Sequence, residues 1–140
     1  MPGKTIHDLQ VGDRAEITRT FTEEDVQRFA QVSGDHNPAH LDEAYAKETM
    51  FKTRIVHGML VSSLFSALLG TELPGLGTIY TGQTLRFTKP VYFDVPITAS
   101  VTVKEVVAEK NRVILNCQAV DPDGDTVVLG EATVMPPRKP

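Results

Sequence analysis

The segment HGMLVSSLFSALLG, residues 57–70, decides the fold of this 140-residue chain. Apolar side chains occupy almost every side of the helix that it would form, and serines are its main polar residues. A helix that is apolar nearly all round is stable when other elements cover it, because few of its faces can be left in water. We therefore expect one long central helix that the rest of the chain encloses.

The residues that follow supply the enclosing layer. Four runs alternate between apolar and polar residues, and prolines and turn sequences separate them: 77–91, 96–109, 112–120 and 126–135. Alternation with period two predicts half-buried strands. With a shorter strand at 14–21 they predict an antiparallel sheet of about five strands. Strands and helices do not alternate along the chain, so we expect an α+β fold with the sheet around the helix rather than a Rossmann-like one.

The residues before the central helix predict two further helices. In FTEEDVQRFAQVSG, residues 21–34, Thr22 is a suitable N-cap, acidic residues follow it, and Phe21 and Val26 can form a hydrophobic staple. This helix should end at Gly34, and a short one is expected within 42–50. Between them, SGDHNPAH (33–40) is expected to be a loop, because Pro38 disfavours a continuous helix.

Composition limits the class of protein. The length suits one domain spanning residues 1–140, and 41% hydrophobic with 23% charged residues is typical of a soluble globular protein. A net charge of −4 argues against a nucleic-acid partner. Cys117, the single cysteine, should be a buried thiol in a strand. The sequence shows neither a signal peptide nor a membrane-spanning segment, so a cytoplasmic protein without a membrane partner is expected.

The 33–40 loop concentrates titratable side chains. Asp35 and His40 can face one pocket if the chain turns back at Asn37, and such a pair suits the activation of water. In the alternative interpretation Asp35 only caps the following turn and His40 is a satisfied, partly buried histidine. The spacing between His36 and His40 invites a metal, but Pro38 interrupts the helix that would align the rings, so we expect no metal.

The start of the central helix adds a second chemical feature. The first N–H groups of a helix have no partner within it, and Gly58 would let a substrate carbonyl come close to them, forming an oxyanion site. Alternatively, Gly58 only permits close packing while His57 caps the helix or packs beside it. Ser66 is a candidate hydrogen-bond donor near the site, and no signature marks any serine of this helix as a nucleophile.

Three stretches resemble the MaoC-like (R)-specific enoyl-CoA hydratases: 29–46, 55–70 and 79–91. The resemblance is carried by positions that match the family signature, namely Phe29, Ser33, Gly34, Asp35, Asn37, Pro38, His40 and Ala46. Ala39 departs from it, since the family usually has a larger aliphatic residue there. The order of elements agrees along nearly the whole chain.

The resemblance implies a hot-dog fold and the reversible addition of water to trans-2-enoyl-CoA. It implies that Asp35 and His40 are catalytic, that the Gly58 N–H polarises the thioester carbonyl, that Asn37 supports the loop and that Ser66 lies near the acyl end of the site. His57 is a further candidate for a supporting role. It also implies a homodimer that needs no cofactor and takes the CoA arm near the subunit boundary. A hot-dog thioesterase and a non-catalytic acyl-thioester binding protein are the alternatives. Chain length, the choice between CoA and acyl carrier protein, and the pathway are left open.

Overall fold

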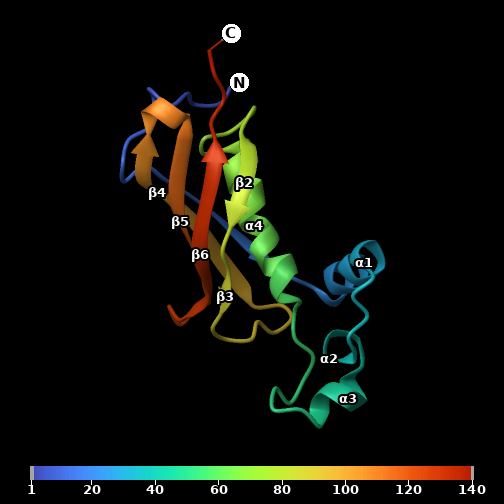
Figure 1. Cartoon of the computed structure of the whole chain (residues 1–140). Coiled ribbons are helices and arrows are strands. Elements are labelled where there is room, and N and C mark those ends of the chain that lie inside the picture. The colour runs from blue at the N-terminus through green and yellow to red at the C-terminus, as the bar shows by residue number, and fades with distance from the viewer. Residues whose placement is uncertain (1, 140) are drawn as a thin grey trace.

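A long helix, α4 (Gly58–Thr71), lies against one face of an antiparallel sheet in the computed structural model, which describes residues 2–139 (Figure 1). The strand order is β1-β4-β5-β6-β2, and β3 also pairs with β6. The strands are β1 (Arg14–Thr20), β2 (Ile79–Gln83), β3 (Arg86–Phe87), β4 (Pro96–Val107), β5 (Arg112–Val120) and β6 (Thr126–Met135). This confirms the predicted α+β architecture.

The core lies between α4 and the sheet, and the period-two alternation explains its composition. On β4 the residues Ile97, Ala99 and Val101 are fully buried, as their alternation predicted. The Cys117 thiol on β5 is also buried among apolar neighbours, and this burial raises its pKa to about 11. Helix α4 contributes its own buried side chains to the same core: Val61, Leu64, Phe65, Leu68 and Leu69.

The sheet does not enclose α4 completely. Met59, Ser63, Ser66 and Ala67 lie along one side of α4 and are exposed, so this chain leaves that side uncovered. The sheet covers the apolar side of α4 as expected, and this strip of mostly small side chains is the part of the helix surface that remains open. Among the described residues, no helix is long and apolar enough to span a membrane.

The N-terminal helices follow their capping signals. Helix α1 (Glu23–Ser33) begins after Thr22, whose side chain forms a reciprocal capping box with Asp25, and it ends at Gly34 with a φ of 80°. Helix α3 (Glu43–Lys47) is capped by Asp42 and is shorter than the predicted segment. Figure 1 shows α1, α2 and α3 gathered beyond the end of α4 at which that helix begins.

Two predictions need correction. The stretch 33–40 is not a loop throughout, because α2 (Pro38–Leu41) forms one helical turn after Asn37. Proline is compatible with the first position of a helix, where its missing N–H is not needed.

The run 77–91 is not one strand but two, β2 and β3, so the sheet has six strands. Between them, the Thr84 N–H donates to the Glu131 carbonyl and Thr84 Oγ1 accepts the Glu131 N–H. The Thr84 carbonyl approaches Gly130 so closely that a Cβ there would lie 1.8 Å from its oxygen. A short helix, η1 (Ala108–Lys110), also precedes the turn at Asn111, which has a φ of 52°.

Candidate active site

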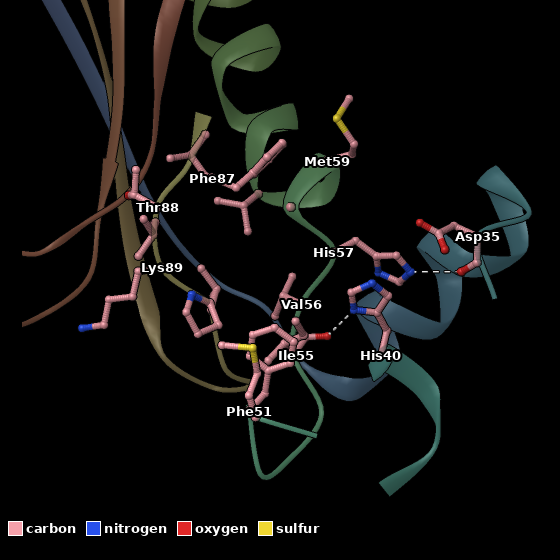
Figure 2. Close-up of a pocket in the computed structure, with 17 residues that line it drawn as sticks. Asp35, His40, Phe51, Ile55, Val56, His57, Met59, Phe87, Thr88 and Lys89 are labelled. Atoms are coloured by element: carbon pink, nitrogen blue, oxygen red, sulfur yellow. Dashed lines mark hydrogen bonds between the residues drawn. The ribbon is translucent and has the colours of Figure 1, made fainter. Parts of the chain in front are cut away.

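A cavity of about 470 Å³ lies where three parts of the chain meet. The polypeptide around α2 contributes Asp35 and His40 to its lining, and the start of α4 contributes His57 and Gly58 (Figure 2). The other walls come from the segment that leads into α4 and from β3 with the residues after it. They include Phe51, Ile55, Met59, Phe87, Thr88 and Lys89.

Local structure presents His40 to this cavity. The Asn37 side chain caps α2 by accepting the Ala39 N–H at 3.0 Å, and His40 lies in the single turn that follows. The imidazole is 9% exposed, and its Nδ1 lies 2.7 Å from the Ile55 carbonyl oxygen. A carbonyl can only accept, so Nδ1 carries the hydrogen and donates it. The Nε2 atom of His40 is then left with a free lone pair, as a general base requires.

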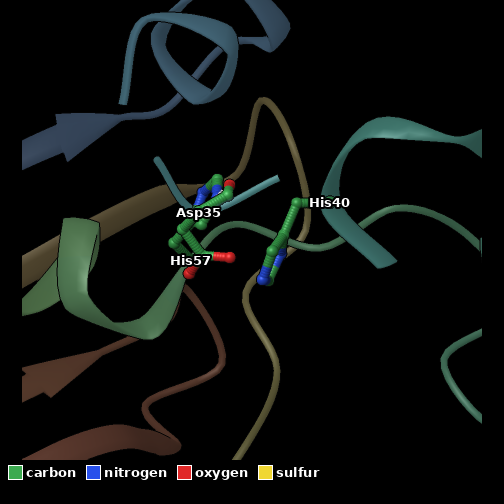
Figure 3. A group of neighbouring side chains, drawn as sticks. All are labelled: Asp35, His40 and His57. Atoms are coloured by element: carbon green, nitrogen blue, oxygen red, sulfur yellow. The ribbon is translucent and has the colours of Figure 1, made fainter. Parts of the chain in front are cut away.

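Asp35 lies in the non-helical stretch between α1 and α2. Its N–H donates to Ser33 Oγ, and its Oδ1 accepts the Asn37 N–H at 3.3 Å. A carboxylate oxygen of Asp35 and a ring nitrogen of His40 lie within 4.8 Å of each other (Figure 3). The hydrogen bond from Asn37 to Asp35 and the bond from His40 Nδ1 to Ile55 match the alternative interpretation, in which Asp35 caps a turn and His40 is a partly buried histidine with a partner. However, both side chains also line one cavity, which that interpretation does not require.

The first amides of α4 form the second chemical element of the site. His57 makes no side-chain cap, and among residues 2–139 neither the Gly58 nor the Met59 N–H has a hydrogen-bond partner. These donors lie at the positive end of the helix dipole and border the cavity, so they can bind a partly negative oxygen. Gly58 also has a steric role, because a Cβ there would lie 2.6 Å from two ring carbons of Phe87.

Three side chains approach closely enough to be considered for a metal. Asp35, His40 and His57 each offer one ligand atom, and these atoms lie within 4.8 Å of one another. His36, which the sequence spacing suggested, is exposed and does not belong to this group. One nitrogen of His40 and one of His57 are already bonded to backbone carbonyl oxygens. Each imidazole therefore has one nitrogen left for an ion, and chelation tests the expectation of a metal-free site.

Ser66 lies outside this cavity. It lines a neighbouring groove of about 530 Å³ between α4 and β2, together with Tyr80, Gln83 and Leu85. Met59 lines both spaces, so the groove and the cavity are neighbours along α4. The sequence interpretation did not identify the cavity walls at Phe51, Phe87 and Lys89. No local pattern marks them, because they reach the cavity only through the pairing of β3 and the course of the chain before α4.

Comparisons with known proteins agree with this geometry. The family model described as "MaoC like domain" matches residues 7–120. The (R)-specific enoyl-CoA hydratase of Rhodospirillum rubrum is 46% identical over 94% of this chain and 91% of its own length. A mitochondrial 3-hydroxyacyl-[acyl-carrier-protein] dehydratase of Arabidopsis thaliana is 38% identical over 92% of this chain and 78% of its own. The unliganded structure of R-hydratase PhaJ1 from Pseudomonas aeruginosa superposes with a TM-score of 0.91 at 48% identity, covering 98% of this chain and 88% of that one.

Proposed function

Because this chain belongs to the MaoC-like domain family, we propose that it is an (R)-specific enoyl-CoA hydratase with the hot-dog fold. This hydro-lyase adds water reversibly to trans-2-enoyl-CoA and yields (R)-3-hydroxyacyl-CoA. One observation carries the proposal: the Asp35 carboxylate and the His40 imidazole lie within 4.8 Å of each other in a cavity bordered by the free amides of α4. CoA is the preferred carrier, because identity is higher to the CoA-named relative, 46%, than to the carrier-protein one, 38%.

The first step of the reaction concerns the water molecule. One water can hydrogen-bond to both Asp35 and His40, since two bonds of about 2.8 Å each reach across such a gap. His40 Nε2 accepts a proton from this water while its oxygen forms a bond to C3 of the enoyl thioester. The carboxylate of Asp35 accepts the other O–H and orients the nucleophile. Proton transfer by a positioned pair contributes roughly 10²–10⁴-fold to the rate.

The second step concerns the charge that develops on the thioester. As the C3–O bond forms, the C2–C3 π electrons move toward the carbonyl oxygen, which becomes enolate-like. The Gly58 N–H donates to that oxygen, and removal of such a donor typically costs about 10²–10³-fold. The pair then delivers a proton to C2 from the side on which the water was held, so hydration is syn. Water supplies both added groups, and no cofactor is required.

The supporting residues hold the catalytic side chains and the substrate in place and do not contact the reacting atoms. Asn37 caps the turn that carries His40, and His57 is the residue immediately before α4. Ser66 lies two turns further along α4, in the groove toward which the acyl chain would extend.

We infer a homodimer, with β2 and β3 at the subunit boundary. The two edges of the sheet differ: β1 presents charged side chains such as Arg14 and Glu16, which form an ion pair, whereas β2 and β3 present exposed Ile79, Tyr80 and Phe87. Charge protects an edge strand from pairing, and exposed apolar residues together favour association. A second copy on this edge would also cover the open side of α4. A cytoplasmic location belongs to the same proposal.

Sedimentation tests the dimer. Ile79→Lys should shift the protein toward monomers and lower its activity in parallel, because it places a charge on the apolar edge. Glu16→Lys on β1 is the matched control and should leave the dimer intact. A fully active monomeric wild-type protein would contradict the proposal.

Incubation with crotonyl-CoA tests the reaction. Hydration removes the absorbance of the conjugated enoyl thioester, whereas a thioesterase would release free CoA thiol and a binding protein would do neither. Asp35→Asn and His40→Ala should each remove most of the hydration without unfolding the protein. The double variant should be about as inactive as either single one, since groups that act as a unit are not additive. Near-normal kcat in either variant would refute the shared-water mechanism.

A further inference from the structure

His57 makes contacts that a simple helix-capping residue would not need. Its side chain is 1% exposed, and its ring stacks on that of His40 with centroids 3.9 Å apart and planes 28° from parallel. The Phe29 ring packs against it as well, with a centroid distance of 4.8 Å. Stacking on His57 therefore restricts the orientation of the His40 imidazole ring.

A hydrogen bond links the same side chain to Asp35. His57 Nε2 lies 3.0 Å from the backbone carbonyl oxygen of Asp35 and must carry the hydrogen, because that oxygen can only accept. His57 Nδ1 is buried and has no partner among the described residues. Burial also lowers the pKa of His57, which keeps the ring neutral. The imidazole thus has one donor, and it directs this donor at the backbone of Asp35.

Asp35 needs such an anchor. It is exposed and lies in a non-helical stretch, and its other hydrogen bonds are to Ser33 and Asn37, within two residues along the chain. Bonds this local shape the turn and join it to Asn37, the N-cap of α2, but they do not fix it relative to α4. The bond from His57 spans 22 residues and joins the turn to the start of α4. One side chain thus contacts both members of the proposed catalytic pair and stands next to the Gly58 amide.

We infer that His57 is a positioning residue that sets the separation of Asp35 and His40 by binding the backbone of one and stacking on the ring of the other. This inference rests on the proposed hydratase function. The donor at the position of Nε2 carries most of this role, and stacking of the flat ring on His40 adds to it. A displacement of about 1 Å between reacting groups can reduce the rate about 10²-fold.

The test separates the donor from the packing. His57→Gln keeps an N–H at about the distance of Nε2, whereas His57→Met has a similar length and no donor. We expect His57→Gln to keep kcat within about tenfold of the wild type and His57→Met to lose about 10²-fold. KM should change little in both variants, because neither removes a substrate contact. The exposed His36, replaced in the same two ways, is the matched control and should keep full activity.

Stability is measured alongside, so that unfolding is not mistaken for loss of positioning. If His57→Met does not fold, His57→Asn replaces it, because its amide is one bond too short to reach the Asp35 carbonyl. Equal kcat values per folded molecule in the Gln variant and in the variant that cannot donate to the Asp35 carbonyl would overturn the inference. An inactive wild type in the crotonyl-CoA assay would instead overturn the hydratase function, and this inference with it.

Discussion

Gly58→Ala tests whether the start of α4 must remain free of a side chain. The new Cβ would lie 2.6 Å from the Cδ1 and Cε1 atoms of Phe87, whereas carbon atoms in contact are ordinarily about 3.5–4.0 Å apart. Relief of the overlap therefore requires a shift of about 1 Å, either of the Phe87 ring or of the helix terminus. Both responses alter the cavity wall beside the proposed oxyanion donor, and a shift of that size can lower kcat about 10²-fold.

Stability should respond differently from activity in this variant. Alanine is favoured over glycine by about 1 kcal/mol in a helix interior, and Gly58, as the first residue of α4, gains only part of this, which offsets little of the steric cost. We expect a small change in Tm and a large change in kcat. The assay is crotonyl-CoA hydration, with unfolding followed separately.

A double-mutant cycle identifies the cause. Once Phe87→Ala has removed the ring, adding Gly58→Ala should lower kcat by less than about threefold, because the overlap no longer exists. Full kcat in Gly58→Ala alone would refute the steric argument. If Gly58→Ala lowers kcat just as much when Phe87 is already alanine, the loss does not come from overlap with the Phe87 ring.

Three further predictions concern the metal interpretation, pH and the sheet. Chelator treatment should leave hydration unchanged, and activity lost to a chelator and restored by zinc would establish a metal at Asp35, His40 and His57. Burial lowers the pKa of His57 from 6.5, so between that lowered value and 6.5 the unfolded chain binds a proton that the folded chain does not. Stability in urea should fall with decreasing pH in this window, by at most about 1.4 kcal/mol per pH unit, and identical pH dependence in His57→Gln would contradict this. Gly130→Ala should destabilise by about 1–3 kcal/mol or more because of the Thr84 carbonyl, whereas Gly70→Ala, with no atom within 4 Å of the new Cβ, should not.

Most of the fold follows from patterns that act over short distances. The cap at Thr22, the stop at Gly34 and the alternation along β4 each predict one element, and the structure contains each of them. The break between β2 and β3 could not be predicted in the same way. It depends on Thr84 crossing β6 at Gly130, 46 residues away along the chain, and alternation of side chains carries no information about that contact. A glycine inside a strand is the one available signal of such a close approach.

In the candidate site, too, local sequence indicates some features, whereas others depend on contacts between distant residues. The types and spacing of Asp35 and His40 allowed both side chains to face one pocket if the chain turned back at Asn37, and the structure has both in the lining of one cavity. The hydrogen bonds that orient the two histidines end on the carbonyl oxygens of Ile55 and Asp35. Every residue has such an oxygen, so sequence cannot distinguish these two. The stacking of His57 on His40 likewise requires the start of α4 to meet α2, which only the tertiary structure brings about.

The configuration of the hydration product tests the central claim most directly. Crotonyl-CoA is incubated with the wild-type protein, and the 3-hydroxybutyryl product is resolved by chiral chromatography. Because Asp35 and His40 hold the water on one side of the bound enoyl thioester, we predict a single enantiomer, the (R) product. The (S) product, or a mixture of both, would contradict the account.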